Sequence, residues 1–294
     1  MQASDIAQAL LEDLPAIKED KQLSFVKSKI SAIEDADTKT LATAFLLVGM
    51  QLGGACVDRH IVLLVHGIRT RGIWQDLVAS LLEKHSNVKP VIVGFGYFDL
   101  FCFWFPYFFR STPIEKVERE IRGAMKDNKG AKVSVVAHSF GTYVISRILL
   151  SKPDIQLHRL LLCGAIINNN FSWDHLTCFP TGGVINDVGT QDTLPALART
   201  VSWGYGNTGT FGFRTHRVKD RYFNFGHSDF FNTAQIEKYW VPFIVRGEIV
   251  ESEWSYQRPT PSLWLSVLHL IPMKSIVLPA LISSLAYGVY KIFV

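Results

Sequence analysis

Val133-Ser-Val-Val-Ala-His-Ser-Phe-Gly-Thr-Tyr143 runs from an apolar, β-branched segment into a small-x-Ser-x-Gly turn and on into a helix-forming segment. The pattern predicts a buried strand, a sharp turn that carries Ser139, and a helix over 140–150. Bulky side chains two positions before or after the serine would collide, and these positions hold Ala137 and Gly141. Such a turn lifts the serine hydroxyl above the strand end, beside a helix N-terminus that favours negative charge.

Strands and helices alternate on both sides of this stretch. Apolar runs predict strands at 61–65, 91–95, 133–137 and 159–167, with shorter ones at 184–185 and 222–225. Amphipathic runs predict helices at 74–83, 112–126, 140–150 and 232–245. This alternation predicts the α/β class, with a mostly parallel sheet covered by helices.

The chain of 294 residues suits one large domain with appendages. Residues 1–57 are expected to form an N-terminal helical extension and residues 58–246 the α/β core. Residues 247–294 are expected to form a linker and a hydrophobic C-terminal helix.

Charge and cysteine content exclude several classes of function. The net charge is +4 and the basic residues are scattered, so no nucleic-acid partner is expected. The four cysteines form no CxxC pair and no zinc-ligand spacing, which predicts free thiols in a reducing compartment and no metal site. The N-terminal residues show no secretory leader, so we expect the protein to start in the cytoplasm.

A second motif, His66-Gly67-Ile68, follows the first expected strand. Together, Leu-Leu-Val-His-Gly67 and Ala-His-Ser-Phe-Gly141 resemble the lipase/esterase-like branch of the α/β-hydrolase superfamily. The segment Val65-His-Gly-Ile-Arg-Thr-Arg-Gly72 is also similar to a group of largely uncharacterised bacterial hydrolases. The resemblance covers about residues 60–245. It implies an acyl-enzyme mechanism, no cofactor, and the order serine, acid, histidine along the chain.

On this resemblance, Ser139 is the expected nucleophile, and the backbone amides of Ile68 and Phe140 form the oxyanion hole. The histidine should follow the last strand, where Phe223-Asn-Phe-Gly-His-Ser-Asp229 places His227. The acid should follow a late strand, and the loop within 184–192 carries two aspartates. The family pattern favours Asp192, and Asp187 stays open as the alternative.

Other polar motifs compete for a role. His138 is expected to support the turn by packing or hydrogen bonding, and His66 to shape the oxyanion loop. His216 is an alternative base, but no strand-like run immediately precedes it. Gly204-Tyr-Gly-Asn-Thr-Gly209 matches GxGxxG but follows no clear strand and opens no helix, so it is interpreted as a flexible loop near the site.

Two apolar segments are candidates for contact with the substrate or with a membrane. Residues 95–109 hold ten aromatic residues in fifteen positions and follow the second expected strand, where they could line an acyl pocket, touch lipid or pack on the N-terminal helices. Residues 262–294 are strongly apolar, and a tail within or on a membrane is favoured over a helix buried in the protein or in an oligomer interface.

The expected function is therefore a serine hydrolase that cleaves acyl esters, with the esters of membrane lipids among the candidate substrates. We expect it on the cytoplasmic side, associated with the membrane through residues 262–294. The alternative is a catalytically silent protein of the same fold that works as a binding or membrane-effector module, with bacterial defence as one setting for that role.

Overall fold

The computed structural model describes residues 5–6, 9–10, 19–43, 59–67, 73–94, 110–254, 256–268, 270, 273–275, 279, 283–284, 287 and 291. The chain divides into two compact units, residues 1–59 and 60–294. The first unit contains helix α2 (Glu19–Ser31), and in it Val26 and Leu10 belong to one small apolar cluster. The expected helical character of this region is thus present where the structure describes it.

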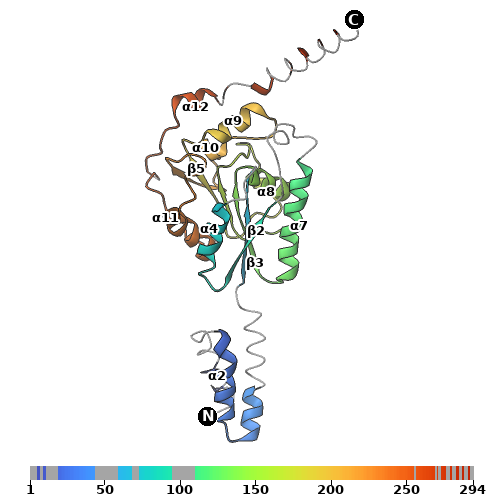
Figure 1. Ribbon diagram of the computed structural model, residues 1–294, viewed down its shortest axis with the longest axis vertical. Helices are drawn as coiled ribbons and strands as arrows, with labels where there is room; N and C mark the ends of the chain where they lie inside the picture. The colour runs from blue at the N-terminus through green and yellow to red at the C-terminus, as the bar shows by residue number, and fades with distance from the viewer. Residues whose placement is uncertain are drawn as a thin grey trace. The chain divides into compact units, whose positions relative to one another are not determined.

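The second unit is built on one six-stranded sheet (Figure 1). Its strands are β1 (His60–Val65), β2 (Val88–Val93), β3 (Lys132–His138), β4 (Leu160–Cys163), β5 (Val184–Gly189) and β6 (Lys219–Phe223). The spatial order is β2-β1-β3-β4-β5-β6, and every neighbouring pair is parallel. The predicted parallel sheet is confirmed.

Two strands, β4 and β5, differ from the predicted length by several residues. β4 ends at Cys163 rather than at residue 167, because Gly164 takes a φ of 54° that turns the chain out of the sheet. β5 is longer than predicted, because its polar residues are buried and paired. The Asn186 amide, for example, donates to the Thr208 carbonyl at 3.0 Å and to Asp220 at 2.8 Å.

Helices cover both faces of the sheet. They are α4 (Ile73–Leu82), α7 (Ser111–Asp127), α8 (Phe140–Ser151), η2 (Trp173–His175), α9 (Thr193–Val201), α10 (Thr208–Phe211), α11 (Thr233–Gln235), η3 (Ile236–Trp240), η4 (Pro242–Arg246) and α12 (Leu263–Leu268). Apolar side chains of α7 and α8 pack on one face, and those of α4, η3 and η4 on the other. The four predicted helices of the core are confirmed, while α9 lies outside the predicted set.

The central strand β1 shows why the two faces form two cores. Its six residues are all buried, and successive side chains point to opposite sides. Ile61 and Leu63 therefore join the cluster under α7 and α8, whereas Val62 and Leu64 join the cluster under α4. A strand buried in this way needs an uninterrupted apolar sequence, which is what the pattern at 61–65 indicates.

Because all strands are parallel, their carboxyl ends lie along one edge of the sheet. The expected site residues all leave strands at this edge: Gly67 after β1, Ser139 after β3, Asp192 after β5 and His227 after β6. Ser139 also lies where the strand order reverses, between β1 and β3, the usual place for a ligand site in such sheets.

Several expectations fall on residues outside the described part of the chain. These are the amide of Ile68, the aromatic segment 95–109, part of the expected N-terminal helical extension and most of the tail beyond 268. In the part of the chain that is described, no helix has both the length and the apolar character needed to cross a bilayer.

Candidate active site

Ser139 sits on a strained turn between β3 and α8. Its φ of 54° and ψ of −122° lie in a region that non-glycine residues rarely adopt. The turn is held on both sides: the Ser139 amide donates to the Cys163 carbonyl at 3.1 Å, and the Ser139 carbonyl accepts from the Thr142 hydroxyl at 2.6 Å. Strain of this kind persists only where the surroundings fix it, and it is typical of functional residues.

Two glycines let the backbone approach this turn closely. A Cβ on Gly141 would lie 2.7 Å from the carbonyl oxygens of Val65 and His66. A Cβ on Gly67 would lie 2.8 Å from the Ser139 Cβ and 3.1 Å from its Oγ. The loop after β1 therefore passes directly against the serine hydroxyl, as an oxyanion-hole loop must.

Of the two residues expected to supply the oxyanion-hole amides, the structure describes Phe140 but not Ile68. Phe140 is the first residue of α8, directly after the serine, and its side chain is buried. Ile68 lies outside the described residues, although Gly67 immediately before it is described. In the same loop, His66 Nδ1 lies 2.5 Å from the Gly67 carbonyl oxygen, and burial lowers the pKa of His66. A neutral His66 can donate to that carbonyl and fix the loop.

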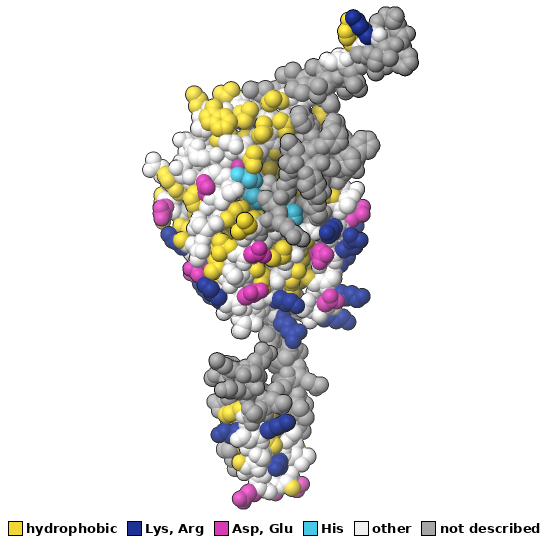
Figure 2. Space-filling model, viewed as in Figure 1, with side chains coloured by type: hydrophobic (Ala, Val, Ile, Leu, Met, Phe, Trp, Pro, Cys, Tyr) yellow, Lys and Arg dark blue, Asp and Glu magenta, His cyan; other side chains and the backbone are white. Residues whose placement is uncertain are grey.

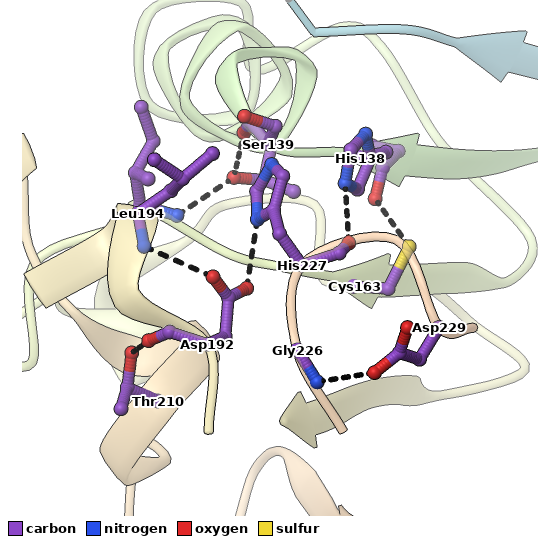
Figure 3. Close-up of polar contacts among 12 residues, drawn as sticks. His138, Ser139, Cys163, Asp192, Leu194, Thr210, Gly226, His227 and Asp229 are labelled. Carbon is purple, nitrogen blue, oxygen red and sulfur yellow. Dashed lines mark hydrogen bonds and ion pairs between the residues drawn. The ribbon is translucent and has the colours of Figure 1, made fainter. Parts of the chain in front are cut away.

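His227 and Asp192 meet at the same edge. Nδ1 of His227 lies 2.8 Å from Oδ2 of Asp192, whose side chain is fully buried. The other carboxylate oxygen accepts the backbone N–H of Leu194 at 3.0 Å, so Asp192 also caps helix α9. Figure 3 shows the His227 ring between the Asp192 carboxylate and Ser139. These two contacts fix the Asp192 carboxylate so that it can orient the His227 imidazole. The Nε2 edge of the imidazole then faces away from the carboxylate.

Asp187 has different partners. Arg221 donates to both of its carboxylate oxygens, at 2.8 and 3.0 Å, and the indole of Trp240 donates to it at 2.8 Å. Arg221 and Asp187 face each other across β5 and β6, and both side chains are fully buried. In the structure, Asp192 therefore pairs with His227. Asp187 instead forms a buried ion pair with Arg221, which the sequence did not indicate.

His138 contacts His227 from the side of the Ser139 turn. Its Nε2 lies 3.2 Å from the His227 carbonyl oxygen, and the two rings are 4.4 Å apart. Phe231 packs edge-on against His138 and stacks on Trp74. Burial, and then the nearby His227, hold the pKa of His138 well below its usual range. A neutral His138 can donate from Nε2 to that carbonyl, which matches the predicted supporting role.

Gly164 is a site residue that sequence reasoning missed. A Cβ there would lie 2.9 Å from Cε1 of His227 and 3.2 Å from Nε2 of His138. The backbone after β4 therefore forms one wall of the space that holds the histidine ring. The glycine inside an apolar strand-like run, at 159–167, was the available signal.

The remaining candidates lie elsewhere. His216 is exposed, and its Nε2 lies 3.5 Å from Asp174. After its exposed first glycine, the GxGxxG segment is buried and hydrogen-bonded, so the prediction of a flexible loop is wrong. The amide of Gly206 donates to the Ile166 carbonyl at 2.8 Å, and a Cβ on Gly209 would collide with the Ala165 nitrogen. These glycines allow close contact with the chain that leaves β4.

The arrangement of Ser139, His227 and Asp192 is capable of nucleophilic chemistry by side chains. Within the described residues, no group of His, Cys, Asp and Glu side chains has a geometry that could hold a metal ion. Cys163 and Cys178 are free thiols, and burial raises the pKa of Cys163 well above its usual range, so its thiolate is not formed. Ser139 is the nucleophile candidate that the geometry supports.

Comparisons with known proteins give matches among solved structures alone. No protein-family model and no curated protein matches the sequence. Among solved structures, an alpha-beta serine hydrolase homologue from Coxiella burnetii is 13% identical, with a TM-score of 0.42, and the match covers 64% of this chain and 84% of that chain. A cutinase-like protein from Cryptococcus sp. is 10% identical, with a TM-score of 0.34 and coverage of 56% and 75%. The catalytic core of acetyl xylan esterase from Trichoderma reesei is 8% identical, with a TM-score of 0.33 and coverage of 64% and 91%.

Proposed function

We propose that this protein is a serine hydrolase that cleaves acyl esters through an acyl-enzyme intermediate. The observation that carries the proposal is the hydrogen bond between Asp192 and His227 beside the strained turn of Ser139. A buried carboxylate that orients an imidazole next to an elevated serine is the arrangement that activates a weak hydroxyl nucleophile.

In the first half of the reaction, the Ser139 hydroxyl attacks the ester carbonyl carbon while Nε2 of His227 takes the hydroxyl proton. Asp192 holds the ring by its Nδ1–H and stabilises the imidazolium that forms. The carbonyl oxygen becomes an oxyanion, for which the backbone amides of Phe140 and Ile68 are the proposed donors. The imidazolium then protonates the leaving alcohol, and Ser139 is left acylated.

In the second half, water attacks the acyl-enzyme with His227 as general base, and the acid product leaves as Ser139 recovers its proton. This mechanism requires no charged side chain beside the acyl group of the substrate. The described residues around the histidine pair are largely aromatic, with Phe231 and Trp74 stacked beside His138. An apolar acyl chain is the substrate class that such surroundings favour, and the lipase-like specificity is part of the proposal.

A fluorophosphonate probe tests the proposal directly, because it reacts covalently with an activated serine. We expect labelling of the wild-type chain and its loss in Ser139→Ala. The matched control is Ser151→Ala, at the exposed far end of the same helix, where the hydroxyl only donates to the Arg147 carbonyl at 2.8 Å. Labelling that survives in Ser139→Ala, or that is missing from a folded wild-type protein, would refute the hydrolase and favour the silent module.

Substrate class is tested with p-nitrophenyl esters of increasing acyl length. We expect kcat/KM to rise from acetate to medium chains, because each buried methylene contributes about 0.8 kcal/mol. A preference for acetate over every longer chain would contradict the apolar acyl site.

A further inference from the structure

Helices α9 and α12 form one exposed apolar surface, which we call the α9–α12 face. The two helices pack on each other, and Leu265 of α12 is fully buried beneath the surface. Large apolar side chains remain exposed on both helices and just after them: Leu194, Leu197, Leu263, Trp264, Val267 and Leu270. Figure 2 shows hydrophobic side chains gathered at the upper end of the core, where Figure 1 places α9 and α12.

Polar contacts hold the segment that carries α12 against the core. The Lys274 ammonium donates to the carbonyls of Arg199 and Ser202 at the end of α9, at 3.0 and 3.2 Å. Before α12, the Gln191 amide donates to the Thr260 carbonyl at 3.4 Å. The apolar side chains of the two helices are therefore presented together, as parts of a single surface.

The stretch of sequence that carries α12 contains charges of one sign only. Residues 254–294 contain no Asp or Glu but include Arg258, Lys274 and Lys291. On α9, Arg199 is exposed, whereas the nearest acid, Asp192, is fully buried and bound to His227. An apolar surface with a basic rim is complementary to a bilayer that contains anionic lipids. It suits a second copy of the chain poorly, since a symmetric contact would bring two basic rims together.

The face is also next to the candidate active site. Asp192 caps α9 through the N–H of Leu194, and Leu194 is already one of the exposed residues of the face. The surface therefore begins two residues after the proposed acid, at the edge of the sheet where Ser139 lies.

We propose that the α9–α12 face docks on anionic lipid bilayers and thereby brings the carboxyl edge of the sheet to the membrane surface. Docking itself depends on the α9–α12 face and not on hydrolase activity. The consequence that the substrate is an ester of a membrane lipid rests on the proposed hydrolase function. Docking adds the core helix α9 to the membrane contact expected from residues 262–294.

Flotation with vesicles tests the docking. The full chain carries Ser139→Ala so that no lipid is consumed, and the vesicles contain phosphatidylcholine with or without phosphatidylglycerol. The face variant combines Leu197→Gln, Trp264→Gln and Val267→Gln. Its matched control combines Ile92→Gln, Leu150→Gln and Ile249→Gln, three residues outside α9 and α12 with similar exposure: 48, 43 and 45% against 38, 55 and 51%.

We expect the face variant to lower partition onto the anionic vesicles by at least about tenfold, which corresponds to about 1.4 kcal/mol. The control variant should stay within about twofold of the parent. Leu197→Gln alone should also weaken partition relative to Leu150→Gln, and this comparison isolates α9 from the tail. Partition of the parent should be stronger with phosphatidylglycerol than without it.

Equal partition of the face and control variants would overturn the proposal, because the tail alone would then anchor the chain. A face variant that shifts only a dimer–monomer equilibrium in sedimentation would also overturn it. Failure of the hydrolase proposal looks different: the vesicles would bind the parent, while the fluorophosphonate probe would leave the wild-type serine unlabelled.

Discussion

Strand β5 and the loop after it carry two buried aspartates, five positions apart, that have opposite kinds of surroundings. Asp187 accepts three hydrogen bonds from Arg221 and Trp240, and Arg221 also donates to the carbonyls of Tyr239 and Val250. Asp192 accepts from the backbone N–H of Leu194 and meets a histidine whose side chain keeps 16% of its exposure.

The difference lies in the partner rather than in the carboxylate. A guanidinium stays charged at every ordinary pH, so Asp187 and Arg221 form a permanent pair enclosed by protein. An imidazole can gain and lose a proton, and His227 has a side that faces away from its aspartate. The same carboxylate therefore serves stability in one place and can serve proton transfer in the other.

The strongest test of this comparison is Asp192→Asn. The amide oxygen can still cap α9, so we expect little change in thermal stability. The carboxylate that orients His227 and stabilises its charged form is lost, and we expect kcat/KM on a p-nitrophenyl ester to fall by about 10⁴-fold. A decrease of less than about tenfold would mean that Asp192 does not act with His227 in catalysis.

The second test is Asp187→Asn, which should act on stability instead. Removing the charge leaves Arg221 buried without its counter-ion, and we expect the free energy of unfolding in urea to fall by about 3–5 kcal/mol. The double variant Asp187→Leu with Arg221→Met removes both charges and should recover part of that loss, because the Trp240 N–H and two backbone carbonyls lose their partners. Esterase activity per folded molecule should be retained in the double variant, and its loss there would contradict the purely structural role.

The two aspartates also show how far the sequence could be interpreted. Periodicity and small residues were enough to predict the strand, the turn at Ser139 and helix α8, because these depend on neighbours along the chain. The partner of Asp187 depends on the register of β5 and β6, which sets Asp187 opposite Arg221. Register is a property of two distant segments, and no local pattern at either aspartate reveals it.

The GxGxxG segment illustrates the same limit. Its glycines could be interpreted locally only as freedom of the backbone, whereas the structure uses Gly206 and Gly209 for contact with the chain that leaves β4. Gly164 is a similar case, since its role depends on His227, which lies 63 positions further along the sequence. Such close approaches between distant segments appear only once the fold is known.

The third test uses Gly164→Ala to disturb the partner of Asp192 without touching either aspartate. The new Cβ would meet the His227 ring at 2.9 Å, and we expect the displaced base to lower kcat by about 10²-fold. Gly130→Ala is the matched control, because that glycine has a φ of 84° but nothing within 4 Å of its Cβ. If both variants lost the same activity, backbone strain rather than contact with His227 would be responsible.

The smallest expected effect concerns His138, whose ring lies against that of His227. Burial holds the pKa of His138 well below its usual range, so the folded protein keeps this ring neutral. The unfolded chain binds a proton there below about pH 6.5, so folding loses stability as the pH falls below that value toward the lower folded-state pKa.

We therefore expect the urea midpoint of the wild-type protein to fall between pH 7.5 and pH 5.5. His138→Phe removes the titrating group and keeps an aromatic ring against Phe231. It should reduce the change in the free energy of unfolding between these two pH values by about 1 kcal/mol. His175→Gln, at an exposed position, is the control that should leave the dependence unchanged. If the free energy of unfolding of His138→Phe changed with pH as that of the wild type does, protonation of His138 would not be the cause of the pH dependence.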